Sequence, residues 1–396
     1  MTFVVELGAV EGFTLDDPVR GVLDNVNHTL GGITFAAVTD YVVDATISRG
    51  KNRDLQRFQA GRATIELVNQ NREFDPEYSG ATFQERIEPR APIRLSWMGE
   101  RIFTGIVSDW DLTYNVTGQS RATVTALDEM TLLALQDTVE EVATTQYSGE
   151  RVAAILDQES VNWPADRRNI DTGESILGTD TISGDALSYL QKVEQSEQGQ
   201  LFIARNGDLQ FRSRLDATPT SGTYLTLGDD DTGIPYSEIA INYGTELLFN
   251  RVTVSSAAGT TIANNTPSQL RYGISELNLE TLVNSAAQVT NLADYLVQRY
   301  GEPEYRPEAV KISIDRLPTA DKNDLAALEI GDVVLLKFTP NGIGSAVSLF
   351  NQVIRIDHDV QTDRHDMIIG LQSLEWNFLV LDDAEFGIIG TGRLAF

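Results

Sequence analysis

The chain has 396 residues and a formal net charge of −28, and it contains no cysteine. A chain of this length can hold two or three domains with apolar cores, and the absence of cysteine excludes disulfides and thiolate metal sites. The acidic excess argues against a nucleic-acid-binding protein, because affinity for DNA depends largely on cationic side chains that displace phosphate counterions. No apolar run approaches the roughly 20 residues that cross a bilayer, and the N-terminus lacks a signal-like pattern. We therefore expect a soluble chain without a membrane-spanning segment.

The first well-defined element is a strand over residues 61–67, in which apolar and polar residues alternate. Such alternation is typical of a strand with one buried face. Residues 69–76 follow as a turn, with Phe74 as its large apolar anchor. Further strands are predicted at 93–97, 102–114 and 122–127, joined by turns at 98–100 and 115–118. This pattern indicates an antiparallel meander.

A similar series of segments returns late in the chain, at residues 309–314, 333–338, 350–360 and 366–374. The long strand of each series begins with Phe and ends among aspartates, at Asp109 and Asp111 in the first and Asp357 and Asp359 in the second. We interpret the two series as a duplicated β-domain. The alternative stays open that two unrelated meanders share this coarse pattern.

The segment between the two meanders changes character. One helix is predicted after an N-cap at Ser148 and a second between Ser183 and Gly199, and a hairpin around Asn206-Gly207 is expected to use a type I′ turn. A helix with an apolar stripe over 289–300 is expected to pack against the second β-domain. The predicted fold class is mainly β (α+β), with two antiparallel β-barrel or sandwich domains. Their bounds are 1–135 and 236–375, around an α+β insert at 136–235 and before an extension at 376–396.

Three segments could carry charged or metal-binding sites. The basic loop 49–53 is either a contact for an acidic partner or a solvated hairpin tip. Residues 229–233 place three aspartates near a glycine, but they lack the alternating ligand spacing of a calcium loop, so a structural turn is favoured. His358 and His365 lie among aspartates that suit a divalent ion. Neighbouring residues on a strand point to opposite faces, however, so polar hairpin positions are the favoured interpretation, and we predict no metal site.

Catalytic motifs are missing from the sequence. A Cys-His pair cannot form, and neither a Gly-x-Ser-x-Gly elbow nor a Gly-x-x-x-x-Gly-Lys loop occurs. A pair of carboxylates for glycoside hydrolysis stays open, but no particular pair is indicated. We therefore predict no catalytic residue and no cofactor.

The run from Gly61 to Pro76 (GRATIELVNQNREFDP), followed by residues 93–95 and 99–106, resembles the minor tail proteins of long-tailed bacteriophages, in particular their baseplate or tail-tip hubs. Residues 185–214, 246–252, 376–383 and 386–396 extend the resemblance over most of the chain. The residues that carry it and that we expect to be structural are Gly61, Asn71, Arg72, Phe74, Asp75, Pro76, Phe103, Gly105 and Asn250.

The resemblance implies a structural protein with two tube-like β-domains. Three copies would form a homotrimeric ring of six similar domains that matches a hexameric tail tube. Its implied neighbours are the tail tube or a distal tail protein above, and a tape measure protein and central tip or fibre proteins below. DNA would pass an acidic lumen without specific binding. The implied location is the tail tip of a virion, after assembly in the host cytoplasm.

Two other functions stay open: a six-copy distal tail adaptor with a role in host-surface binding, and, least favoured, a cell-wall hydrolase. The segment after Leu374 is too short for a fused lysozyme or peptidase, so wall-digesting activity is expected on another chain. Its apolar residues either dock on a neighbouring subunit or pack on the same chain. These residues are Phe378, Leu379, Phe386, Ile388 and Phe396.

Overall fold

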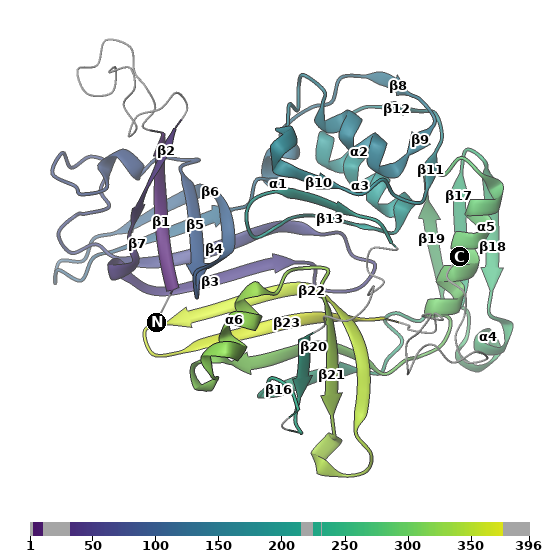
Figure 1. The fold of residues 1–396 in the computed structure, drawn as a ribbon. Coiled ribbons are helices and arrows are strands. Elements are labelled where there is room, and N and C mark those ends of the chain that lie inside the picture. The colour runs from purple at the N-terminus through teal and green to yellow at the C-terminus, as the bar shows by residue number, and fades with distance from the viewer. Residues whose placement is uncertain (1–2, 11–31, 215–224, 231, 375–396) are drawn as a thin grey trace.

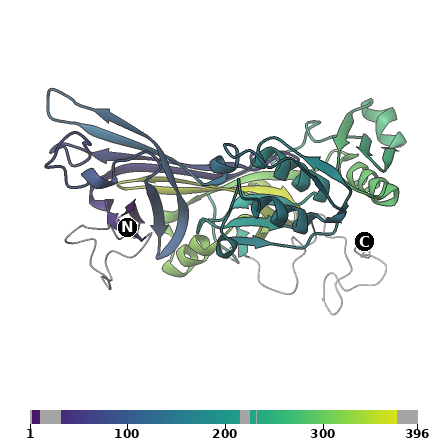
Figure 2. The same cartoon turned by 90° about the horizontal axis from the view of Figure 1, so that it is seen from above.

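The computed structural model describes residues 3–10, 32–214, 225–230 and 232–374 (Figures 1 and 2). The fold is mainly β, as the sequence predicts, and its largest element is a sheet of 13 strands. These strands are β1 (Phe3–Val10), β2 (Ile33–Ala37), β3 (Val42–Gly50), β4 (Gln59–Val68), β5 (Pro92–Trp97), β6 (Glu100–Thr113), β7 (Arg121–Leu127), β15 (Leu225–Gly228), β16 (Glu238–Asn242), β20 (Arg306–Ser313), β21 (Val333–Phe338), β22 (Val347–Gln361) and β23 (His365–Ser373).

Shorter strands and the helices complete the described chain. The strands are β8 (Glu141–Ala143), β9 (Gln146–Tyr147), β10 (Arg168–Ile170), β11 (Ile176–Leu177), β12 (Asp180–Ile182), β13 (Gln200–Ile203), β14 (Leu209–Arg212), β17 (Arg251–Ser256), β18 (Gly259–Asn264) and β19 (Glu276–Glu280). The α-helices are α1 (Met130–Leu133), α2 (Ser148–Leu156), α3 (Ala186–Glu197), α4 (Thr266–Tyr272), α5 (Ala286–Tyr300) and α6 (Thr319–Ala327). Single 3-10 turns are η1 (Thr39–Tyr41), η2 (Gln84–Arg86), η3 (Ala165–Arg167), η4 (Ile314–Arg316) and η5 (Pro340–Gly342).

The first half of the large sheet contains the predicted meander. Its strand order is β3-β4-β7-β6-β5-β1-β2. The alternation in β4 is confirmed, since Ala63, Ile65 and Leu67 are fully buried while the residues between them are not. Met98 and Gly99 both have positive φ, 53° and 88°, as a two-residue type I′ turn between β5 and β6 requires.

The second half of the sheet follows the same order as the first. Its path is β16-β20-β23-β22-β21-β15, in which β16, β20, β23, β22 and β21 correspond to β3, β4, β7, β6 and β5. The long hairpins also share a register shift at one place, between Val107 and Asp109 in β6 and between Val353 and Arg355 in β22. The halves end differently, because β1 joins β5 antiparallel whereas β15 joins β21 parallel. The shared strand order and register shift are what a duplicated β-domain predicts.

The two halves are joined within the sheet, which the sequence does not predict. The late part of β22 pairs antiparallel with β3, from Arg355 opposite Gly50 to Gln361 opposite Asp44 (Figure 1). One apolar core runs through both halves and through the α+β segment between them. The expected segments 1–135 and 236–375 therefore both contribute strands to one continuous sheet.

The α+β segment contains the predicted helices and hairpin, with differences at their ends. Helix α2 has Tyr147 at its N-cap instead of Ser148, and Asp185 instead of Ser183 caps α3 by accepting a bond from the Ser188 amide. The β13–β14 turn is not type I′. Gly207 has a positive φ of 95° whereas Asn206 has none, and a type I′ turn needs both.

Helix α5 does not pack against the second β-half, contrary to the prediction. It packs on the small sheet β18-β17-β19, and Leu292 and Leu296 share a separate core with Val252 and Val254. Figure 2 shows this unit at one end of the molecule, opposite the β6–β7 hairpin. The sequence predicts the apolar stripe of α5, but it does not predict the sheet against which α5 packs. An apolar stripe indicates only that one side of a helix is buried, not which surface covers it.

Asn250 stabilises the start of this small unit, where the chain enters β17. Its side chain is fully buried, accepts a bond from the Ser275 amide at 2.9 Å and donates to the Gly273 carbonyl at 2.7 Å. A second donor bond reaches Ser268 at 3.3 Å. Both ends of the amide are therefore used, which explains a structural requirement for Asn at this position.

Two expectations concern the chain ends and membranes. Phe378, Leu379, Phe386, Ile388 and Phe396 lie outside the described residues, so their docking stays a prediction. Among the described helices, none combines the length and apolar character needed to cross a bilayer.

Candidate functional site

One face of the large sheet is polar, and it extends across both halves of the sheet. On β3, for example, Asp44, Thr46 and Ser48 alternate with the buried Ala45 and Ile47. The same alternation continues across the neighbouring strands. We name this surface the polar face; its charged members are Asp44, Arg62, Glu66, Asp109, Asp111, Arg121, Glu238, Lys311, Arg355, Asp357, Asp359 and Asp366.

Acidic residues outnumber basic ones on the polar face, and several are placed against each other. Asp359 lies opposite Asp366, and Asp44 lies opposite Glu66. Burial and the neighbouring Glu66 raise the pKa of Asp44. Arg121 binds Glu66 at 3.0 Å, and Lys311 binds Asp366 at 3.1 Å. The basic residues thus hold particular carboxylates in place and leave the face acidic.

Where the two halves meet, the polar face is hollowed into a groove of about 530 Å³. Thr46, Ser48 and Arg62 line one side, and Asp357, Asp359 and Lys311 line the other. The Ser48 hydroxyl donates to Asp357 across the seam at 2.7 Å. The groove is open and lined by side chains from five strands, so it does not enclose a small molecule as a typical ligand pocket does.

The loop 69–76, part of the run that carries the sequence resemblance, packs against the end of β6. Phe74 is fully buried, stacks on Phe83 with ring centroids 5.0 Å apart, and lies against Trp110 at 6.2 Å. The Asp75 carboxylate accepts bonds from the Tyr114 hydroxyl at 2.6 Å and from Arg72 at 2.7 Å. The Tyr114 bond, with that of Arg72, lowers the pKa of Asp75. The loop therefore fixes both aromatic residues at this strand end.

The other motif residues are divided between this loop and the strand starts. Asn71 and Pro76 are exposed; Asn71 donates to Glu73, and the Pro76 carbonyl accepts a bond from Gln84. Gly61, Phe103 and Gly105 meet at the far ends of β4 and β6. A Cβ at Gly105 would lie 2.3 Å from the Leu127 carbonyl oxygen, so only glycine fits there.

Gly61 and the start of α1 share one buried carboxylate. Asp128 accepts bonds from the Gly61 amide at 2.6 Å and the Met130 amide at 3.0 Å. Burial raises the pKa of Asp128 to about 7. This residue links β4 to α1, and its local pattern in the sequence does not distinguish it from a surface acid.

Arg49 contacts both halves of the large sheet and the α+β segment between them. It is 5% exposed, binds Glu329 at 2.5 Å, and donates to the carbonyls of Ile102 and Ile203. Glu329 also accepts the Arg205 amide at 2.8 Å. These contacts connect β3, the α+β hairpin and the residues before β21, so breaking this buried pair would leave an unpaired charge.

The basic loop 49–53 is therefore neither a partner contact nor a solvated tip at its first positions. Lys51 is also buried, lies over the Phe58 ring at 5.0 Å, and has its pKa lowered by burial. Of the three basic residues of the loop only Arg53 is well exposed, and it pairs with Glu246 at 2.8 Å. The sequence does indicate that Arg49 is buried, because it follows Ala45 and Ile47 at the alternating inward positions of β3.

His358 and His365 lie beneath the seam between the halves, not on polar hairpin faces. Both are buried, their Nδ1 and Nε2 atoms are 3.0 Å apart, and the Trp97 ring of the first half packs against both. Burial lowers the pKa of His358 well below its usual range and that of His365 to about 4. The pair is therefore neutral at pH 7 and structural in its contacts.

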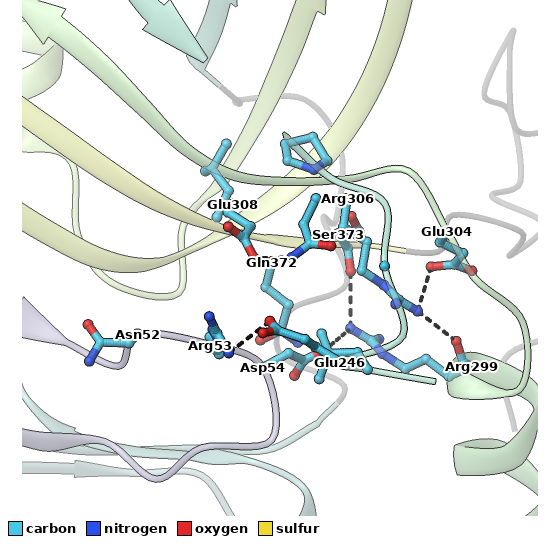
Figure 3. A pocket seen from close by; sticks show the side chains of 15 residues that line it. Asn52, Arg53, Asp54, Glu246, Arg299, Glu304, Arg306, Glu308, Gln372 and Ser373 are labelled. Atoms are coloured by element: carbon cyan, nitrogen blue, oxygen red, sulfur yellow. Dashed lines mark hydrogen bonds and ion pairs between the residues drawn. The ribbon is translucent and has the colours of Figure 1, made fainter. Parts of the chain in front are cut away.

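A second polar junction surrounds a cavity of about 40 Å³ between α5, the loop after β3 and the end of β23 (Figure 3). Asp54 accepts bonds from Arg299 at 3.1 Å and the Tyr300 hydroxyl at 2.5 Å, and Arg299 also donates to the Ser373 carbonyl. Burial would raise the pKa of Asp54, but Arg299 and Lys51 lower it. The charged side chains pair with one another and the space holds a few water molecules at most, so the junction anchors the small unit.

The acidic turn at 229–233 makes internal bonds. Asp230 accepts the amide and hydroxyl of Thr232, and Asp229 accepts the Thr339 amide at 2.7 Å. Asp231 lies outside the described residues. Across the part of the chain that the structure covers, no three His, Asp or Glu residues converge in a way that could hold a metal ion.

Comparison with solved structures finds this fold in bacteriophage tail proteins. The 43 kDa tail protein of prophage MuSo2 from Shewanella oneidensis has a TM-score of 0.58 at 15% identity, covering 94% of this chain and 98% of that one. A tail protein from Neisseria meningitidis MC58 has a TM-score of 0.60 at 11% identity, covering 94% and 96%. Prophage tail protein gp18 from Listeria monocytogenes EGD-e has a TM-score of 0.50 at 12% identity, covering 94% and 95%.

No protein-family model and no curated protein sequence matches the chain. The fold is nevertheless that of the two prophage tail proteins over nearly the whole length of this chain and of theirs. The resemblance inferred from the sequence is thereby confirmed at the level of the fold.

Replacing His365 with Gln should change how stability depends on pH. A histidine with a lowered folded-state pKa stabilises the fold fully above its unfolded pKa of about 6.5, and this contribution is lost as pH falls toward 4. Asp128 and Glu194, with pKa values raised to about 7, act in the opposite direction over the same range. The parent curve alone is therefore uninformative, and the difference between variant and parent must be measured.

We expect the free energy of unfolding of His365→Gln, relative to the parent, to rise by roughly 1 kcal/mol per pH unit between pH 6 and 4.5. Urea unfolding at a series of pH values measures it. The difference at pH 7.5 gives the cost of the substitution itself, and a difference that stays constant down to pH 4.5 would show that His365 is not held neutral.

Proposed function

We propose that this chain is a structural component of a phage tail tip, in which three copies form a ring that continues the tail tube and passes DNA along the polar face. The role involves no chemical step. The observation that carries the proposal is the repeated strand order of the two halves. Two similar units per chain let three chains present six similar units, which matches a six-fold tube to a three-fold tip.

The joined sheet supports this arrangement. Because β3 pairs with β22, the polar faces of both halves form one surface within a chain. A ring of such chains can present this surface to a central channel while the apolar face remains covered by the core. The tail tube or a distal tail protein above, and tape measure and central tip proteins below, are the proposed neighbours.

The acidity of the polar face supports passage of DNA without binding. Phosphates are repelled by Asp44, Glu66 and the aspartates of β6 and β22, and three of the four basic residues, Arg121, Lys311 and Arg355, are engaged by carboxylates. A channel wall of this kind binds DNA weakly, because tight binding would need many unpaired cations.

The copy number tests the ring. Native mass spectrometry of the purified chain, together with symmetry analysis of assembled tails by electron microscopy, should give three copies. Six copies would contradict the proposal and favour a distal tail adaptor, since a six-copy ring needs no duplication within the chain.

Charge reversal tests the lumen. Asp44→Lys with Glu238→Lys changes equivalent positions of the two halves on the polar face. We expect the assembled variant to gain salt-sensitive binding to double-stranded DNA, measured by fluorescence anisotropy, which the parent lacks. The matched control is Glu276→Lys with Glu280→Lys, which makes the same charge change on exposed positions of β19. Equal binding by both variants would show that the polar face has no privileged access to DNA.

A further inference from the structure

Within the described residues the large sheet has several unpaired strand edges, among them the late part of β6 and the outer side of β16. The β5 side of β6 is paired only as far as Val107, so the edge over Asp109 to Thr113 is open. Strand β16 pairs with β20 on one side only. Open edges present unpaired amide and carbonyl groups that favour the addition of another strand.

The pairing inside the chain shows what these edges fit. By strand order, the late part of β6 corresponds to that of β22, and β16 corresponds to β3. In the chain, β22 and β3 pair with each other. The same contact between corresponding strands would therefore join the late part of β6 in one copy to β16 in the next.

The register follows from the shared shift in the long hairpins. Asp109 corresponds to Arg355, since each is the first paired residue after the shift. In the first half, the residues paired in turn with Asp109 across β7, β4 and β3 end at Thr46. In the second half, the residues paired in turn with Arg355 across β23, β20 and β16 end at Ala240. Ala240 therefore corresponds to Thr46. The pairs Arg355–Gly50, Asp357–Ser48 and Asp359–Thr46 then predict Asp109–Gly244, Asp111–Asn242 and Thr113–Ala240 between copies.

The burial of the inward residues supports the same partner. Ile356, His358 and Val360 on β22 are at most 4% exposed, whereas their counterparts Trp110 and Leu112 are half-buried and Tyr114 is 52% exposed. On the other strand, Ala45, Ile47 and Arg49 are buried. Their counterparts Ile239 and Ile241 are half-buried, and Tyr243 is 68% exposed. The inward apolar residues of late β6 and of β16 are thus partly exposed, whereas the corresponding residues of β22 and β3 are buried.

We propose that the late part of β6 in one copy pairs antiparallel with β16 of a second copy, with Asp111 opposite Asn242 and the stripe Trp110, Leu112 and Tyr114 against Tyr243, Ile241 and Ile239. The occupant of each edge is a copy of this chain, because the matching strand pair is already present within it. The contact is head-to-tail, so it can close into a ring. This inference rests on the proposed ring and names its interface.

The contact also explains what the loop 69–76 stabilises. The loop 69–76 holds Trp110 through Phe74 and Tyr114 through Asp75, at the strand end that would receive the next copy. Uncharged residues face the aspartates in both seams. Within the chain Ser48 and Thr46 lie opposite Asp357 and Asp359. Between copies Gly244 and Asn242 would lie opposite Asp109 and Asp111, so no new like-charge pair is created directly across the strands.

Cysteine cross-linking tests the register, because the chain contains no cysteine of its own. The Lys51 amide donates a hydrogen bond to the Ile354 carbonyl, which lies opposite it. Hydrogen-bonded and non-hydrogen-bonded pairs alternate along an antiparallel ladder, so Ser48 and Asp357, three residues further on, are a non-hydrogen-bonded pair. The corresponding pair between copies, Asp111 and Asn242, is expected to be of the same kind. Such pairs have Cα atoms about 4.5 Å apart, within reach of a disulfide. We would mix the single variants Asp111→Cys and Asn242→Cys and oxidise them.

We expect a covalent dimer from the mixture and from neither variant alone, because a head-to-tail contact does not bring a residue against itself. The mixture of Asp109→Cys and Ala240→Cys, offset by about 13 Å on the same strands, should give roughly tenfold less dimer. Ser48→Cys with Asp357→Cys in one chain is the positive control, since this pair is adjacent in the structure.

Three results would overturn the interface. They are dimers from a single variant alone, equal cross-linking in and out of register, and no cross-link while the positive control oxidises. The outcomes also distinguish failure of the proposed interface from failure of the proposed three-copy ring. Three copies without the cross-link would retain the ring and reject this interface, whereas covalent chains longer than three from the Asp111→Cys/Asn242→Cys double variant would retain the interface and reject the three-copy ring.

Discussion

The pairing of β3 with β22 is the constraint on which the rest of the structure depends. These strands are about 300 residues apart in the chain, yet their register fixes both faces of the joined sheet at once, because side chains alternate between the faces. On one side the pairing extends the apolar core from the first half into the second. On the other it makes the polar residues of both halves a single surface. A slip of one residue would place Ile356 in the polar groove and Asp357 in the core.

Buried polar groups reinforce that register beneath the seam. Arg49 meets Glu329 from the second half, and Trp97 of the first half packs on His358 and His365 of the second. Such contacts require particular partners, whereas apolar side chains accept many. The small unit of α5 and β17–β19 has its own core and meets the body through Asp54 and Arg299. The body is thus specified by its polar contacts as much as by its apolar core.

Local patterns in the sequence predicted much of this fold, because alternation and turn chemistry are local. The strands around Ile65 and the apolar stripe of α5 are examples, and the loop around Phe74 is another. What failed were relations between distant segments: the partner of α5 and the pairing of β3 with β22. The burial of Arg49 was not predicted, because a charged residue next to a loop is usually exposed, whereas its position in β3 points inward. The Asn206-Gly207 turn was misread because the dipeptide suits more than one turn type. The candidate surface could not be assembled, since acids on separate strands meet only once the sheet order is known.

The central claim is that the polar face of the joined sheet lines the channel of a three-copy ring. The most direct measurement is an electron cryomicroscopy reconstruction of the tail tip that contains this chain. The account predicts three copies around the axis, with Asp44, Asp357 and Asp359 facing the channel. A reconstruction in which these residues face outward, or are buried against another protein, would contradict it.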